Sequence, residues 1–184
     1  MITRSEMRRE EIMIENFADR LLRAIERAGS PVCVGIDPVY ERLPSDFDNV
    51  PDPVRAIEHF SRIVLEIVAS IVPAVKVQIA YFERYGSEGV SAYERIVADA
   101  LSAGLIVIGD VKRGDIGSTV RAYAAGHLER ENSPDAITVN GYFGADGLAP
   151  FIESARRTGK GIFVIVRTSN RSAMEVQDLS LIHI

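Results

Sequence analysis

Two patterns of apolar residues follow one another along the chain. In some segments the apolar residues recur at helical spacing, and in others they form short continuous runs. From Val54 to Ile71 apolar residues recur every three or four positions, as on one face of an amphipathic helix. Further helices are predicted over residues 3–29, 88–103, 116–130 and 145–158, the first with Phe17, Leu21, Leu22 and Ile25 on its apolar face. Buried strands are predicted at residues 31–37, 72–82, 105–112, 136–143 and 161–170, with a loop over residues 39–52.

This alternation of strand and helix predicts an α/β fold. Continuous apolar strands are typical of parallel strands that are covered on both faces. An open doubly wound sheet and a (β/α)8 TIM-type barrel both fit, and both bind ligands at the carboxyl ends of their strands. Polar residues at this end of five predicted strands favour the barrel: Asp37, Lys76, Asp110, Lys112, Asn140 and Arg167.

The predicted barrel is incomplete. Five units lie within the 184 residues, whereas eight units usually need about 250 residues. We therefore expect about five of eight β/α units over residues 31–178, as a partial barrel catalytic domain, after an N-terminal helical extension over residues 1–30. The final LSLIHI matches one frame of a sequencing-library adaptor, so residues 179–184 are expected to be a non-native tail. A natural apolar C-terminus is the alternative.

Composition narrows the class of protein. A content of 47% hydrophobic and 26% charged residues is that of an ordinary globular domain. The net charge of −5 argues against a general nucleic-acid binder. No apolar run is long enough for a membrane span, and the start is too charged for a signal peptide. Cys33, the only cysteine, fits a reducing compartment and is expected to be a buried thiol. We expect a cytoplasmic protein without nucleic-acid or membrane partners.

The stretch GDVKRGDIGST (109–119) concentrates charge at the end of a predicted buried strand. Strand alternation predicts that Asp110 and Lys112 project to the same side, either as a strand-end salt bridge or as a reactive pair. Asp115 could instead cap the next helix. Lys76 lies at the same edge, one strand earlier, which favours a lysine–aspartate array that is fixed before substrate arrives. The chain has 18 arginines and only three lysines: Lys76, Lys112 and Lys160.

Four segments carry a resemblance to a known family: VCVGIDP, VKVQIAYFE, GDVKRGDIGST and ITVNGYFG. Together they resemble orotidine 5′-phosphate decarboxylase, in particular its bacterial subgroup with the DxKRGDIG signature. The resemblance runs from about residue 31 to about residue 170. Related phosphosugar decarboxylases and aldolases share the DxKxxD core. The lysine after the second strand, the KRGDIG form and the GIDP opening make the resemblance specific.

The resemblance implies decarboxylation of orotidine 5′-monophosphate to UMP, the last step of de novo pyrimidine synthesis, without metal or organic cofactor. Lys112 would face C6 of the pyrimidine, stabilise the carbanion and deliver the proton. Asp110 would orient Lys112. Lys76 and Asp37 would bind ribose hydroxyls and complete the charge array.

The resemblance also implies a homodimer with shared active sites. Asp115 would reach into the neighbouring subunit's site with Thr119 near the ribose, and Asn140 would bind the pyrimidine edge. Gly141 departs from the subgroup, in which proline is expected. The family's phosphate-binding elements, a Gly-rich turn and an arginine near the seventh and eighth strands, are missing here. We therefore expect little or no activity from the chain as given.

Two other interpretations remain open. A Mg²⁺-dependent phosphosugar decarboxylase or aldolase of the same superfamily, such as a 3-keto-gulonate-phosphate decarboxylase or a hexulose-phosphate synthase, would carry an acidic residue where Lys76 stands. A non-catalytic barrel fragment would associate through an exposed sheet edge. His59 and His127 are expected on helix faces without a role, and no spacing indicates a zinc site. Arg113 is expected to point away from the pocket, and Arg167 either binds phosphate or forms an ion pair.

Overall fold

Strands and helices alternate along the chain, as the sequence pattern predicts. The computed structural model describes residues 15–178. The strands are β1 (Cys33–Ile36), β2 (Ala74–Gln78), β3 (Ile106–Arg113), β4 (Ala136–Asn140) and β5 (Gly161–Ile165). The helices are α1 (Phe17–Ala28), α2 (Pro53–Val68), α3 (Ala80–Glu83), α4 (Gly86–Ser102), α5 (Gly117–Leu128) and α6 (Gly144–Thr158). Four short 3₁₀ turns are η1 (Tyr40–Arg42), η2 (Ser45–Phe47), η3 (Gly141–Phe143) and η4 (Arg171–Glu175).

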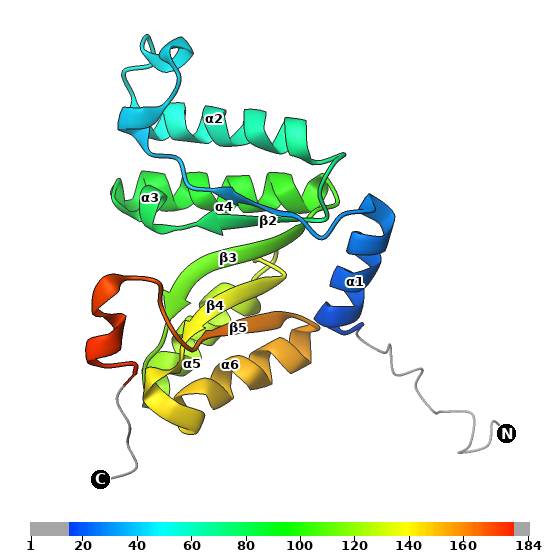
Figure 1. Ribbon diagram of the computed structural model, residues 1–184, viewed down its shortest axis with the longest axis vertical. Helices are drawn as coiled ribbons and strands as arrows, with labels where there is room; N and C mark the ends of the chain where they lie inside the picture. Colours follow the sequence, from blue (N-terminus) through cyan, green and yellow to red (C-terminus); the bar gives the residue numbers. More distant parts are fainter. Residues whose placement is uncertain (1–14, 179–184) are drawn as a thin grey trace, which may run out of the picture.

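All five strands are parallel and are ordered β1-β2-β3-β4-β5 in one sheet. Each strand thus lies beside the strand that follows it in sequence. A doubly wound sheet would reverse its strand order at a switch point, and this sheet does not. The order is that of a (β/α) barrel, of which five units are present (Figure 1).

The main core lies between the strands and the helices. Alternate strand residues face α4, α5 and α6 and are buried: Val75, Val77, Val107, Val111, Ile137 and Val139. The residues between them face the concave side of the sheet, where Lys76 and Thr138 are half-buried and Phe163 is exposed. The expectation of a buried Cys33 thiol is wrong, since Cys33 lies on this concave side and is exposed. Five strands curve without enclosing an interior, so only one face of the sheet is fully covered.

Helix α1 covers the amino-terminal ends of the strands (Figure 1). Phe17 and Leu21 pack against a small buried cluster of Ala24, Ala74 and Ile106. Arg20 adds an ion pair to Asp135 at 2.6 Å. The expected apolar face of this helix is only partly right, because Leu22 is 57% exposed. The rest of the predicted helix, residues 3–14, lies outside the described residues, as does the predicted tail at residues 179–184. The predicted division into extension and barrel stays a prediction.

Three predicted strands end earlier than expected. β2 stops at Gln78 and the chain turns into α3, β4 stops at Asn140 before η3, and β5 stops at Ile165. The apolar run of β2 continues past Gln78, but its later residues, such as Phe82, belong to helix α3 and are buried there. Periodicity alone does not separate a buried strand from a short buried helical turn.

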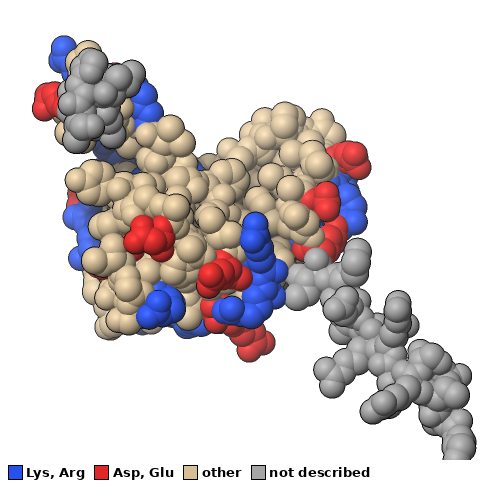
Figure 2. Space-filling model, turned by 90° about the horizontal axis from the view of Figure 1, so that it is seen from below, with Lys and Arg blue, Asp and Glu red and all other residues tan. Residues whose placement is uncertain are grey.

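On the face seen in Figure 2, acidic and basic side chains of the described residues are interspersed among uncharged ones. Charge on this face is therefore mixed rather than gathered into one basic surface. Among the described residues, no helix combines the length and hydrophobicity needed to cross a lipid bilayer.

Two neighbouring leucines of α1 test whether this helix stabilises the barrel. Leu21 is half-buried against the strands and Leu22 is 57% exposed. We expect Leu21→Ala to lower the free energy of unfolding by about 1–2 kcal/mol, because it removes buried apolar contacts. The matched Leu22→Ala should change it by less than about 0.5 kcal/mol. Urea unfolding of both variants measures this, and equal effects would contradict the packing role of α1.

Candidate active site

Three charged side chains meet at the carboxyl ends of β2 and β3. The Lys76 Nζ lies 2.8 Å from Asp110 Oδ2, and the Lys112 Nζ lies 2.6 Å from Asp110 Oδ1. One carboxylate is therefore held between two ammonium groups. The sequence prediction that these three residues converge is confirmed by these distances.

Two neutral side chains complete the shell of Asp110. The Gln78 Nε2 donates to Asp110 Oδ2 at 2.8 Å, and the Thr138 Oγ1 donates to Oδ1 at 2.8 Å. Gln78 is the residue of β2 that pairs in register with Asp110. Each carboxylate oxygen thus accepts from one lysine and one neutral donor, which leaves few lone pairs unsatisfied.

Asp110 is held in its ionised form. Its side chain is only 8% exposed, and burial alone would raise the pKa of its carboxyl. Hydrogen bonds from Lys112, Lys76 and Thr138 outweigh that effect, so the pKa of Asp110 lies below its usual value. The site therefore carries a fixed negative charge beside two lysines.

The end of β3 departs from a regular strand. Gly109 pairs with Ile137 and Arg113 with Val139, so residues 110–112 lie opposite Thr138 alone. Lys112 has a φ of +45°, in the left-handed region that side chains other than glycine rarely adopt. The prediction that Asp110 and Lys112 face the same side is right. Its reason, simple strand alternation, is wrong at Lys112, which a bulge turns toward Asp110.

The two other predicted aspartates lie outside this charged group. Asp37 follows β1 and is exposed. Asp115 Oδ1 accepts the Ile116 amide at 2.8 Å, and α5 begins at Gly117 without a side-chain cap, so the alternative in which Asp115 caps this helix is wrong. Within the described part of the chain, neither aspartate pairs with a lysine. Thr119 is exposed in the first turn of α5.

A cavity of about 650 Å³ opens beside Lys112 at the ends of β4 and β5. Asn140 and Thr168 contribute polar groups to its wall. The Asn140 Oδ1 accepts the Tyr142 amide at 3.0 Å, so its carbonyl is already used to cap η3. Arg167 makes a bidentate ion pair with Asp178, at 2.7 and 2.8 Å, which is the ion-pair alternative that the sequence left open.

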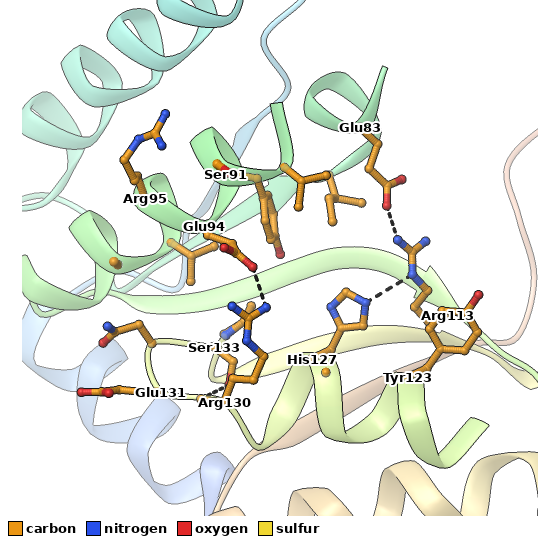
Figure 3. Close-up of a pocket in the computed structure, with 18 of the residues that line it drawn as sticks. Glu83, Ser91, Glu94, Arg95, Arg113, Tyr123, His127, Arg130, Glu131 and Ser133 are labelled. Atoms are coloured by element: carbon orange, nitrogen blue, oxygen red, sulfur yellow. Dashed lines mark hydrogen bonds and ion pairs between the residues drawn. The ribbon is translucent and has the colours of Figure 1, made fainter. Parts of the chain in front are cut away.

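Arg113, the residue after Lys112, points to the opposite, helix-covered side of β3, as expected (Figure 3). Its guanidinium bonds the Val111 carbonyl at 2.9 Å and the His127 Nε2 at 3.3 Å, and it pairs with Glu83. These groups line a second cavity of about 590 Å³ between α4 and α5. Arg113 thereby fastens the end of β3 to two helices, directly behind Lys112.

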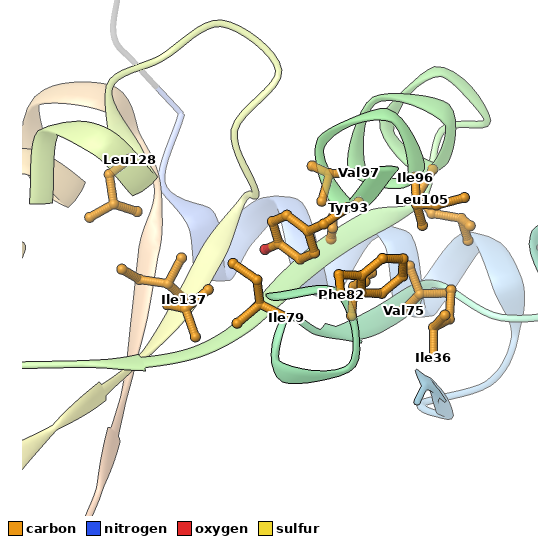
Figure 4. Packing of buried hydrophobic residues seen from close by; sticks show 14 of the residues in the cluster. Ile36, Val75, Ile79, Phe82, Tyr93, Ile96, Val97, Leu105, Leu128 and Ile137 are labelled. Carbon is orange, nitrogen blue, oxygen red and sulfur yellow. The ribbon is translucent and has the colours of Figure 1, made fainter. Parts of the chain in front are cut away.

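Gly109, the residue before Asp110, lets α4 pack closely on β3. A Cβ at Gly109 would lie 2.7 Å from the Tyr93 hydroxyl oxygen and 2.9 Å from Pro134. Tyr93 and Phe82 lie against the strands in the main core, with their rings 5.9 Å apart (Figure 4). Larger side chains at 109 would push this layer away from the strand that carries the site.

Sequence reasoning missed Gln78 and Thr138. Both lie inside predicted strand runs, at residues 72–82 and 136–143, and are uncharged, so nothing in composition singled them out. Position along and across the strands could have identified both residues. Gln78 lies two residues from Lys76 on the same strand face, and Thr138 lies on the strand next to that of Asp110. Among residues 15–178, no group of three or more His, Cys, Asp and Glu side chains is placed to hold a metal ion.

Comparisons with known proteins agree with one another. Residues 30–183 match the sequence model of the "Orotidine 5'-phosphate decarboxylase / HUMPS family". Orotidine 5′-phosphate decarboxylases of a Nocardioides species and of Streptomyces coelicolor are 46% and 45% identical, over 88% and 89% of this chain. The chain spans 59% of the length of each of these two relatives.

Solved structures show the same likeness in three dimensions. The crystal structure of a Streptomyces avermitilis protein is 46% identical, with a TM-score of 0.81 over 89% of this chain and 57% of that chain. Leishmania donovani OMP decarboxylase is 32% identical, with a TM-score of 0.74 over 91% of this chain and 60% of that chain.

His127 makes stability depend on pH in mildly acidic solution. Burial, and then the positive charge of Arg113, lower the pKa of His127 from 6.5 to about 4 in the folded chain. The unfolded chain binds the proton more readily, so this contribution to stability is full above about pH 6.5 and is lost as pH falls through about 4. The difference corresponds to at most roughly 3 kcal/mol. We expect His127→Gln to flatten the decline of unfolding free energy between these pH values.

Urea unfolding at several pH values measures this decline. The matched control is His59→Gln, which removes an exposed imidazole and should leave the decline unchanged. An unaltered slope in His127→Gln would contradict the assignment of this pH dependence to His127.

Proposed function

Because the chain belongs to the orotidine 5′-phosphate decarboxylase / HUMPS family, we propose that its charged edge is the site at which orotidine 5′-monophosphate is decarboxylated to UMP. The observation that carries this proposal is the Asp110 carboxylate between the Lys76 and Lys112 ammonium groups, at 2.8 and 2.6 Å. The enzyme is then a carboxy-lyase of pyrimidine biosynthesis that uses no cofactor.

Lys112 carries the chemical step in this proposal. Loss of CO₂ from C6 of the pyrimidine leaves an electron pair on that carbon, with no cofactor to delocalise it. The protonated Lys112 amine stabilises this charge and then gives its proton to C6, so that UMP forms and the amine regains a proton from water. A fixed ammonium serves this purpose well, because a preorganised charge needs no rearrangement during the reaction.

Asp110 and Lys76 hold Lys112 in place before substrate arrives. The Lys112 side chain is half exposed, and Lys112 lines the cavity at the ends of β4 and β5, while its ammonium is bound to the buried carboxylate. Asp110 thereby orients the proton donor. Lys76 and Asp37 would bind ribose hydroxyls, and Asn140 would bind the pyrimidine edge with its amide hydrogens.

Lys76 also separates this function from its nearest alternative. A Mg²⁺-dependent phosphosugar decarboxylase or aldolase needs an anionic ligand at this position, and metal cations prefer oxygen ligands. Here an ammonium occupies the position and is bound to Asp110 at 2.8 Å. The arrangement therefore favours the cofactor-independent reaction.

The proposal includes a homodimer that shares its active sites. Asp115 pairs with no lysine within the described residues of its own chain, so it is available to a neighbouring site. Ile116 beside it is 60% exposed and Tyr142 is 82% exposed. Thr119 follows in the first turn of α5, where it would approach the ribose of the neighbour. A cytoplasmic location is proposed as well, supported by the single cysteine.

A chimera tests the reaction. Residues 31–178 would replace the matching segment of the Streptomyces coelicolor relative, which is 45% identical. We expect the chimera to decarboxylate orotidine 5′-monophosphate and to be indifferent to EDTA. Lys112→Ala in the chimera should lower turnover at least about a thousandfold, because it removes both the charge and the proton donor. Purified turnover followed by ultraviolet absorbance measures both.

Lys160→Ala is the matched control, because the Lys160 Nζ bonds the Ser133 carbonyl far from the charged edge. It should keep the turnover of the folded chimera. A folded chimera without turnover would contradict the proposed function. We expect little or no turnover from the 184-residue chain alone, because its relatives are longer. Turnover equal to that of a relative would contradict this second expectation.

Ile116→Asp tests the shared interface. Buried against a second copy, an added carboxylate would weaken association, so we expect the dimer dissociation constant to rise at least tenfold, about 1.4 kcal/mol. The matched control is Ile67→Asp on α2, where the isoleucine is 61% exposed. Sedimentation equilibrium of the chimera measures both constants. A monomeric parent chimera, or equal effects of the two substitutions, would contradict the proposed interface.

A further inference from the structure

The bulge at the end of β3 places three residues of β3 opposite one residue of β4. Asp110, Val111 and Lys112 all lie opposite Thr138. Regular parallel strands are joined by evenly spaced backbone hydrogen bonds. A bulge interrupts that ladder and leaves backbone groups that need other partners.

The side-chain hydroxyl of Thr138 is the partner of one of these backbone groups. Its Oγ1 accepts the backbone N–H of Lys112 at 3.0 Å and donates to Asp110 Oδ1 at 2.8 Å. The hydroxyl therefore joins the backbone of Lys112 to the carboxylate that binds the Lys112 ammonium at 2.6 Å. A closed ring of contacts runs from the backbone of Lys112 through Thr138 and Asp110 to its own side chain.

This ring acts on a residue with an unfavourable backbone conformation. Lys112 has a φ of +45°, and residues other than glycine keep such a conformation only where their surroundings fix it. On the helix-covered side, Arg113 fastens the next residue to α3 and α5. On the pocket side, the Thr138 hydroxyl is the contact to the Lys112 amide.

We propose that Thr138 is a positioning residue for Lys112: its hydroxyl holds the left-handed backbone of Lys112 and the Asp110 carboxylate in the one arrangement that aims the ammonium into the pocket. The proposal rests on the proposed function only for the reaction that Lys112 performs. The placement of Lys112 by Thr138 can be measured without turnover.

Three variants separate positioning from general stability. Thr138→Val keeps the shape of the side chain and removes the hydroxyl. Thr138→Ser keeps the hydroxyl and should restore the contacts. Gln78→Leu removes another donor to Asp110, at 2.8 Å, but leaves the Lys112 amide bonded to Thr138. All three are first checked for cooperative unfolding.

Amide hydrogen exchange and lysine methylation give the first readout, on the 184-residue chain. We expect Thr138→Val to speed exchange of the Lys112 amide at least tenfold and to speed reductive methylation of Lys112 severalfold relative to Lys160. Thr138→Ser should match the parent in both. Gln78→Leu should leave the Lys112 amide protected. Unchanged exchange and methylation in a folded Thr138→Val chain would overturn the proposal.

Turnover in the chimera gives the second readout. We expect Thr138→Val to lower kcat at least tenfold with KM within about threefold, because a small misplacement of a reacting group affects the chemical step. Thr138→Ser should recover most of kcat. A kcat equal to that of the parent in Thr138→Val would also overturn the proposal. If the parent chimera has no turnover, the proposed function fails while exchange and methylation still decide the role of Thr138.

Discussion

The whole charged edge depends on one buried carboxylate. Asp110 is taken out of water at the end of the central strand, and an isolated carboxylate there would be strongly disfavoured. Four donors from three strands compensate for that loss of hydration: Lys76 and Gln78 from β2, Lys112 from β3 and Thr138 from β4. The same contacts that make the buried charge tolerable also fix the positions of both lysines.

The strands around Asp110 are held mainly from the convex side. Helices α4, α5 and α6 cover that face, and Gly109 allows the Tyr93 layer to pack against β3. Arg113 adds a polar anchor between α3 and α5. The concave side carries the half-buried polar groups and stays open. The fold thus separates the face that supplies rigidity from the face that can meet a ligand, which is the usual division in barrels.

Much of this arrangement could be predicted from the sequence, because the relevant signals are local. Apolar periodicity indicated five strands and their helices, and strand-end position brought Lys76, Asp110 and Lys112 together. The ends of β2 and β4 were misjudged because Phe82 and Tyr142 continue apolar runs from within short helical turns. The exposure of Cys33 was misjudged because it depends on how far the sheet closes. Thr138 and the bulge were missed because register between β3 and β4 leaves no trace in composition.

The backbone of Lys112 shows a conflict between stability and chemistry. Glycine would adopt a φ of +45° at lower energy than lysine, because glycine has no side chain to clash in this region. A chain selected for stability alone would therefore favour glycine at this position. A lysine there places its ammonium on Asp110, two residues earlier in the same strand. The residue of the sheet with the unfavourable backbone conformation is thus also the one to which the proposed function assigns the chemical step.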